Sequence, residues 1–238
     1  MEKLNENIFH QYNKWKTGYV RKENSLQMRL NNFLTHFNAP KSYTKNFSIS
    51  EDGTCVNCTG DVFIYDENLI NGKLPIPFGK VDGEFDCSGC KELISLEGAP
   101  KEVGGHFFAY DCSKLTSLEG APKEVGGDVC IHSCSNLTSL EGTPEKVGDN
   151  FDCSECPNLT SLEGAPKEVS GWFTCRNCKN IKSLEGAPKK SVLCFVCMGC
   201  KSLTSLEHLP KNIGELMVDR RFEGQIPSDI NITKIQYC

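Results

Sequence analysis

Apolar residues recur along the chain with a period of 22 residues. Each repeat unit contains a leucine or isoleucine that is followed, two residues later, by Ser-Leu-Glu. These positions are Leu93, Leu115, Leu137, Leu159, Ile181 and Leu203. Upstream lies a second apolar column, which we extend outward to Phe63 and Met217: Phe85, Phe107, Val129, Phe151, Phe173 and Phe195. A fixed period of this length is the signature of a repeat architecture, and the units cover residues 85–216.

Each unit divides into an alternating half and a turn-rich half. Residues 107–115 alternate apolar and other side chains, which predicts a short strand. Residues 119–127 contain one proline and three glycines, which exclude a helix and favour turns and extended backbone. We therefore expect one strand and one irregular return per unit. Because one coil cannot bury its apolar side alone, successive coils should stack with parallel strands about 4.8 Å apart.

The repeat resembles two groups of known proteins. The order Phe107-x-Ala109-x-x-Cys112-x-x-Leu115 resembles the core of leucine-rich repeats, in the variety with cysteine where asparagine often stands. The amino-acid sequence of residues 115–127 also resembles repeats in uncharacterised proteins of large bacteriophages and some bacteria. The resemblance covers residues 60–235 and implies an α/β repeat solenoid: a leucine-rich-repeat horseshoe with parallel strands and an irregular convex side. It implies a curved binding scaffold and supplies no catalytic residues.

The chain on either side of the repeats departs from the 22-residue pattern. Apolar residues at helical spacing predict two amphipathic helices near 3–16 and 22–37, which we interpret as a helical N-terminal cap over residues 1–46. Residues 47–84 should hold a hairpin and a first degenerate coil. The hairpin is expected over residues 46–66, turning at Asp52-Gly53.

The C-terminal residues 217–238 lose the Ser-Leu-Glu signature and are predicted to form a degenerate capping coil. We place Ile235 there in register with Val125 and Val147.

Charge is divided unevenly along the chain. Residues 1–46 carry 8 Lys and Arg against 3 Glu, a charge of +5, and the remaining residues carry 18 against 28, a charge of −10. The acidic solenoid is therefore a poor nucleic-acid binder. The basic N-terminus could contact a membrane surface or nucleic acid, but we favour a cap docked on the acidic coils. No secretion signal and no membrane-length apolar stretch is seen, so we expect a cytoplasmic protein, in the host cytoplasm if viral, that binds neither nucleic acid nor membrane.

The fifteen cysteines include pairs with two-residue spacing, which is typical of zinc and iron–sulfur sites. Ten of them fall instead into two columns of the repeat. The first column is Cys90, Cys112, Cys134, Cys156, Cys178 and Cys200; the second is Cys87, Cys153, Cys175 and Cys197. Ala109 and Ile131 fill the remaining places of the second column and cannot ligate a metal. We therefore predict small buried core positions and no bound metal. The run Cys194, Cys197 and Cys200 and the pair Cys55 and Cys58 keep a structural metal site as an alternative.

Motifs of the common enzyme classes are absent. We find no phosphate-binding loop, dinucleotide fingerprint, Gly-x-Ser-x-Gly elbow or His-Glu-x-x-His. A recurring glutamate column has a lysine four residues on in five of six units, as Glu97 has Lys101. We expect these columns to neutralise each other rather than to act as catalytic acids. The sequence thus predicts no enzymatic activity, no catalytic residues, no cofactor and no small-molecule substrate.

The outward strand positions vary from unit to unit, as a binding surface on a regular scaffold requires. They contain side-chain types that are common at interface hot spots. From them we select as partner-binding candidates Phe108, Tyr110, His132, Asp152, Trp172 and Arg176. Two alternatives stay open: sequence drift on an unconstrained face, and a metal site at Cys130, His132 and Asp152.

These observations favour a non-enzymatic scaffold that binds a protein, which would be a host protein if the phage resemblance is meaningful. A structural component of a particle or assembly is the second hypothesis. A metal-binding or sensing protein is the third.

Overall fold

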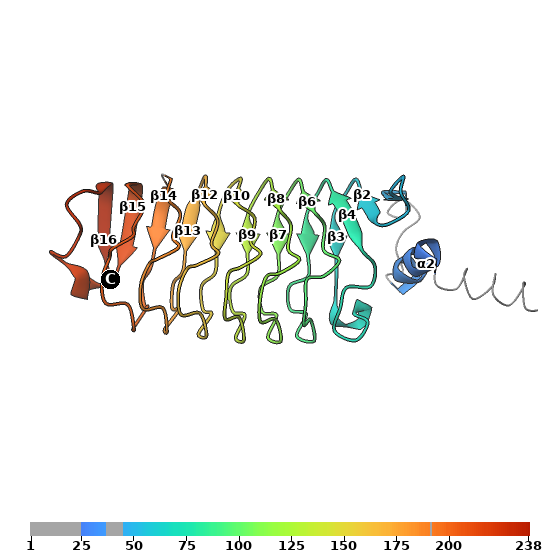
Figure 1. The fold of residues 1–238 in the computed structure, drawn as a ribbon, viewed down its shortest axis with the longest axis horizontal. Coiled ribbons are helices and arrows are strands. Elements are labelled where there is room, and N and C mark those ends of the chain that lie inside the picture. The colour runs from blue at the N-terminus through green and yellow to red at the C-terminus, as the bar shows by residue number, and fades with distance from the viewer. Residues whose placement is uncertain (1–24, 37–44, 191) are drawn as a thin grey trace, which may run out of the picture.

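The computed structural model describes residues 25–36, 45–190 and 192–238. In this part of the chain the fold is a parallel β-solenoid, in which short coils stack in a row (Figure 1). The predicted repeat solenoid is thus confirmed. Besides the strands, the described elements are the helix α2 (Leu26–His36) and the short 3-10 helices η1 (Asp66–Asn68) and η2 (Arg220–Phe222).

The described strands form two sheets, one on each side of the coils. Sheet A has seven strands in the order β1 (Phe47–Ile49), β2 (Val56–Cys58), β4 (Phe78–Val81), β6 (Glu102–Val103), β8 (Glu124–Val125), β10 (Lys146–Val147) and β12 (Glu168–Val169). Sheet B has nine, in the order β16 (Asn231–Tyr237), β15 (Asn212–Val218), β14 (Val192–Val196), β13 (Trp172–Thr174), β11 (Phe151–Asp152), β9 (Val129–Cys130), β7 (Phe107–Phe108), β5 (Phe85–Asp86) and β3 (Val62–Phe63). All pairs are parallel except the antiparallel β1–β2 hairpin.

Sheet A corrects the expectation of an irregular return. In each return a charged residue points outward and the following valine points into the core, as in Glu102-Val103 of β6. Neighbouring coils then pair in register, Glu102 beside Glu124 and Val103 beside Val125. The alternation lasts only two residues per coil, which is too short for a hydrophobic pattern to indicate a strand.

The horseshoe implied by the leucine-rich-repeat resemblance is not seen. The coils follow one another in a nearly straight row in the view of Figure 1. Curvature would require one side of each coil to be wider than the other. Here parallel strands stack on both sides at the same spacing of about 4.8 Å, so neither side is forced apart.

The predicted register of the apolar column is confirmed in the repeats and is wrong at both ends. Phe85, Phe107, Phe151, Phe173 and Phe195 are buried and stack along the inner side of sheet B. At the N-terminal end the partner of Phe85 is Val62 rather than Phe63, and at the C-terminal end the partner of Phe195 is Leu216 rather than Met217. These end steps span 23 and 21 residues (85 − 62 and 216 − 195) in place of 22.

Ile235 is likewise placed differently from the prediction. It pairs with Leu216 in sheet B, whereas Val125 and Val147 lie in sheet A. The closing strand β16 therefore continues sheet B.

The N-terminal elements agree in part with the prediction. The helix expected at 22–37 is present as α2, whose Leu30 and Phe33 are buried. The Phe33 ring meets the rings of Phe47 and Phe78 edge-on at 6.2 and 5.9 Å. The helix expected near 3–16 lies outside the described residues. The hairpin turns at Gly53 as predicted but ends at Cys58, because the chain then crosses to sheet B as β3.

The two cysteine columns are buried, as predicted, and thiols of both columns form hydrogen bonds. In the second column, Cys87, Cys153 and Cys175 donate to backbone carbonyls of the following coil. In the first column, each thiol donates to a backbone carbonyl of the preceding coil. The Sγ–O distances are 3.2 Å from Cys112 to Cys87 and from Cys134 to Ala109, and 3.1 Å from Cys178 to Cys153. Cysteine thus combines small size with a weak donor that satisfies a buried carbonyl group.

Candidate functional site

The outer face of sheet B consists of three rows of side chains that run along the solenoid. The first row is Asp61, Glu84, His106, Asp128, Asn150, Trp172 and Cys194. The second is Phe63, Asp86, Phe108, Cys130, Asp152, Thr174 and Val196. The third is Tyr65, Ser88, Tyr110, His132, Ser154, Arg176 and Met198. All six predicted partner-binding residues lie on this face.

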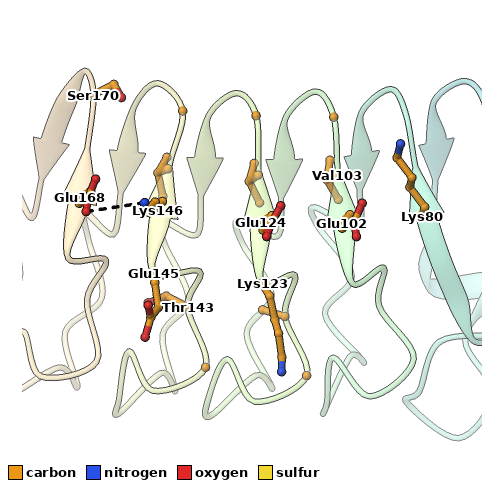
Figure 2. Close-up of a pocket in the computed structure, with 18 residues that line it drawn as sticks. Lys80, Glu102, Val103, Lys123, Glu124, Thr143, Glu145, Lys146, Glu168 and Ser170 are labelled. Atoms are coloured by element: carbon orange, nitrogen blue, oxygen red, sulfur yellow. Dashed lines mark ion pairs between the residues drawn. The ribbon is translucent and has the colours of Figure 1, made fainter.

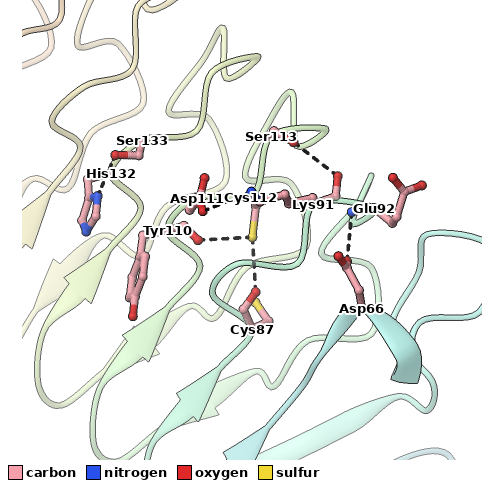
Figure 3. A network of polar contacts seen from close by, with 10 residues as sticks. All are labelled: Asp66, Cys87, Lys91, Glu92, Tyr110, Asp111, Cys112, Ser113, His132 and Ser133. Carbon is pink, nitrogen blue, oxygen red and sulfur yellow. Dashed lines mark hydrogen bonds and ion pairs between the residues drawn. The ribbon is translucent and has the colours of Figure 1, made fainter.

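Four rings contact one another in series along β7 and the end of β9, and we call them the ring stack. The His106 and Phe108 rings lie 5.5 Å apart and nearly parallel, whereas Phe108 and Tyr110 lie 6.3 Å apart with their planes tilted by 55°. Tyr110 stacks on His132 at 4.7 Å with an interplanar angle of 7° (Figure 3). The side chains are partly exposed. Their mutual packing fixes the rings before any partner arrives, which lowers the entropy cost of binding.

Trp172 and Arg176 form a separate part of the face. Trp172 is 51% exposed and stands on β13, three strand spacings from His106, or roughly 14 Å. Arg176 is exposed just beyond the same strand. The six candidates are therefore brought to one face but not into one cluster.

Asp152 and several side chains of the first row form hydrogen bonds to the backbone that the sequence did not indicate. The Asp152 carboxylate accepts a hydrogen bond from the Ser154 N–H at 2.8 Å, which closes a turn. In the first row, Asp128 accepts from the Asn150 N–H at 2.9 Å, and Asn150 accepts from the Trp172 N–H at 2.8 Å. These side chains tie consecutive coils together where the chain passes between the sheets.

His106 was missed as a candidate although it belongs to the ring stack. Its Nδ1 accepts from the Asp128 N–H at 3.0 Å and lies 3.2 Å from the Asp128 carboxylate. The sequence signal available was its place beside Phe108 on the same strand face.

Three residues of these rows are buried: Ser154, Cys194 and Val196. Cys194 lies between the longer side chains of Trp172 and Glu215, and Val196 lies beside the longer Met217. The Ser154 hydroxyl finds no hydrogen-bond partner there.

A groove of about 1190 Å³ follows the opposite side, over sheet A (Figure 2). Charged side chains line it in a column along sheet A: Lys80, Glu102, Glu124, Lys146 and Glu168. Two of the lining carboxylates are held by lysines at its border, because Lys167 contacts Glu145 at 2.7 Å and Lys190 contacts Glu168 at 2.6 Å. Hydrogen bonds from these lysines lower the pKa of both carboxyls. Outside the groove, Glu97 forms an ion pair with Lys73 at 2.7 Å. The carboxylates toward the C-terminal end of the groove are thus paired, whereas the ion pairs of the described residues do not include Glu102 or Glu124.

Among the residues that the structure describes, no group of three or more His, Cys, Asp or Glu side chains is arranged to hold a metal ion. None of the helices within those residues has the length and apolar character needed to cross a membrane.

No protein-family model matches the chain, and neither a curated protein nor a solved structure matches it.

Proposed function

We propose that the protein is a non-enzymatic scaffold that holds a protein partner on the outer face of sheet B. The observation that carries the proposal is the partly exposed ring stack of His106, Phe108, Tyr110 and His132. Aromatic side chains bury much apolar area for little lost rotamer freedom, and they are enriched among residues that dominate binding energies. The phage resemblance would make the partner a host protein. We also infer that α2 caps the N-terminal end of the core.

The remaining surface supports this choice of face. The sheet A groove is lined by glycines and by charged side chains, of which Glu145, Lys146 and Glu168 form ion pairs with neighbouring coils. Exposed ion pairs contribute little and already have their partners. The sheet B face instead changes its side chains from coil to coil, and Trp172 extends it toward the C-terminal coils.

Affinity capture from the native host tests the proposal. Wild-type protein, a Phe108→Ala/Tyr110→Ala variant and a Glu124→Ala variant on sheet A are used as baits side by side. We expect the partner on the wild-type and Glu124→Ala baits and its loss on the double variant. Calorimetry on the identified partner should then show that Phe108→Ala, Tyr110→Ala and Trp172→Ala each weaken binding by ~1–3 kcal/mol.

Two results would reject this proposal. Unchanged affinity in all three single variants would exclude the outer face of sheet B as the binding surface. Concentration-dependent self-association without any captured partner would favour the structural-component hypothesis instead.

A further inference from the structure

Two short polar side chains on β5 lie between two pairs of aromatic residues. In the second row, Asp86 pairs in register with Phe63 on one side and Phe108 on the other. In the third row, Ser88 lies in the same way between Tyr65 and Tyr110. We call this surface the Asp86 patch: Phe63, Tyr65, Asp86, Ser88, Phe108 and Tyr110.

One face of the Tyr110 ring has no stacked ring among the described residues. His132 covers the face of Tyr110 that is directed toward β9 (Figure 3). The other face is directed toward β5, where the next side chain of the row is the short Ser88, whose buried hydroxyl has no described hydrogen-bond partner. Tyr65, which is 51% exposed, stands two coils away, or roughly 9.6 Å. A cation is attracted to an aromatic face within about 6 Å of the ring centroid, so one cationic group midway between the two tyrosines would lie in range of both rings.

The patch is strongly acidic. The three rows between Asp61 and His132 contain four carboxylates and neither Lys nor Arg. Among the ion pairs of the described residues, none includes Glu84 or Asp86. The pKa of the Glu84 carboxyl is raised by burial and then by the neighbouring charges of Asp86 and Asp61. A positive charge placed here would relieve this repulsion.

The chain contains a second copy of the same motif, and there a basic residue stands in the neighbouring row position. Asp86-Cys87-Ser88 recurs as residues 152–154, and each aspartate accepts from the serine N–H, at 2.7 and 2.8 Å. Beside Ser154, the next coil places Arg176 in the third row. Beside Ser88, the same position holds Tyr110. The first copy thus presents an aromatic face where the second presents a guanidinium group.

We propose that the Asp86 patch binds a Lys or Arg side chain of the protein partner. This inference rests on the proposed function and adds the chemistry of the partner: a segment with a basic residue, seated over Ser88 between Tyr65 and Tyr110. The Asp86 carboxylate supplies the opposite charge, because its hydrogen bond to the Ser88 N–H uses only one of its two oxygens. Ring and carboxylate together select a cation over a neutral side chain of the same shape.

The test is an NMR titration of the full chain with two peptides, acetyl-Gly-Arg-Gly-amide and its neutral citrulline analogue. The amide signals of Ser88 and Tyr110 report on the patch. We expect saturable shifts with the arginine peptide and at least ~5-fold weaker binding of the citrulline peptide. Asp86→Asn, which keeps the turn hydrogen bond, and Tyr110→Leu should each weaken arginine binding by ~3–10-fold. The matched control Asp152→Asn, in the copy that has Arg176, should leave it unchanged.

Several results would overturn the inference. Equal shifts with both peptides, or arginine binding that survives Asp86→Asn, would exclude a cation site at the patch. An equal loss in Asp152→Asn would mean that the charge acts over the whole face. If a captured partner depends on Phe108 but not on Asp86, the proposed function stands and the cation site is wrong. Asp86-dependent arginine binding without any Phe108-dependent partner would support the cation site and reject the proposed function.

Discussion

Alkaline pH should unfold this protein because its buried thiols resist ionisation. Burial is the main cause that raises the pKa of Cys90 to about 12, and it also raises the pKa of Cys156 and Cys197. In an unfolded chain a cysteine ionises near pH 8.5. Above that pH the unfolded state therefore releases protons that the folded state keeps, and the free energy of unfolding falls as pH rises.

The magnitude follows from the number of thiols that stay neutral in the fold. One pH unit above its unfolded pKa, each such thiol lowers the free energy of unfolding by about 1.4 kcal/mol. Cys90, Cys156 and Cys197 alone then remove about 4 kcal/mol by pH 9.5, a large part of the roughly 5–15 kcal/mol that holds a typical domain folded. The other buried thiols with raised pKa values add to this loss.

Urea denaturation of the reduced protein at a series of pH values, followed by circular dichroism, measures the effect. We expect the free energy of unfolding to drop steeply between about pH 8.5 and 9.5. A flat profile over that range would refute the reasoning, since it would mean that the thiols are not buried as neutral groups. Thiolates bound to a metal would behave differently: they would lose stability on acidification and on addition of a chelator.

Two substitutions test the core and the coil spacing. Leu137→Ala should lower the free energy of unfolding, measured in a urea melt, by ~2–5 kcal/mol because the side chain is fully buried. The control Ile94→Ala, at a site 47% exposed, should lower it by under ~1 kcal/mol, and equal losses would mean that the core register is wrong. Gly142→Ala should lower the melting temperature more than Gly53→Ala does, although both glycines have positive φ. A Cβ at Gly142 would clash with the Leu118 carbonyl oxygen of the preceding coil, whereas one at Gly53 would meet no atom. Equal melting temperatures of the two variants would contradict this contact between coils.

The repeat itself was predictable because its period is long, regular and apolar. The inward columns of leucine, phenylalanine and cysteine are buried as predicted, since a strict period leaves each column one environment. Sheet A was not predictable from alternation, because two residues such as Glu124-Val125 carry no period. It is specified by stacking: once Phe107 and Val129 pair in sheet B, the returns are also held side by side and their backbone groups pair.

The outer face could be predicted in composition but not in arrangement. Residue types alone selected Phe108, Tyr110 and Trp172, and all three lie on the face of sheet B. Sequence could not show that Asp152 is engaged in a turn, because that depends on the local backbone of one coil.

The 23-residue step at the N-terminal end of the repeats also explains why the aromatic residues of the Asp86 patch were not predicted from the sequence. Counting back 22 residues from Phe85 assigned Phe63 to the core, but the true step is 23 residues, so Val62 enters the core and Phe63 turns outward. In a strand a one-residue shift exchanges the two faces completely. It therefore carries Tyr65 to the outer face as well, opposite Ser88. A single inserted residue at the edge of the repeats thus places two aromatic side chains beside an acidic row, and this arrangement is what makes a basic partner the specific expectation for this face.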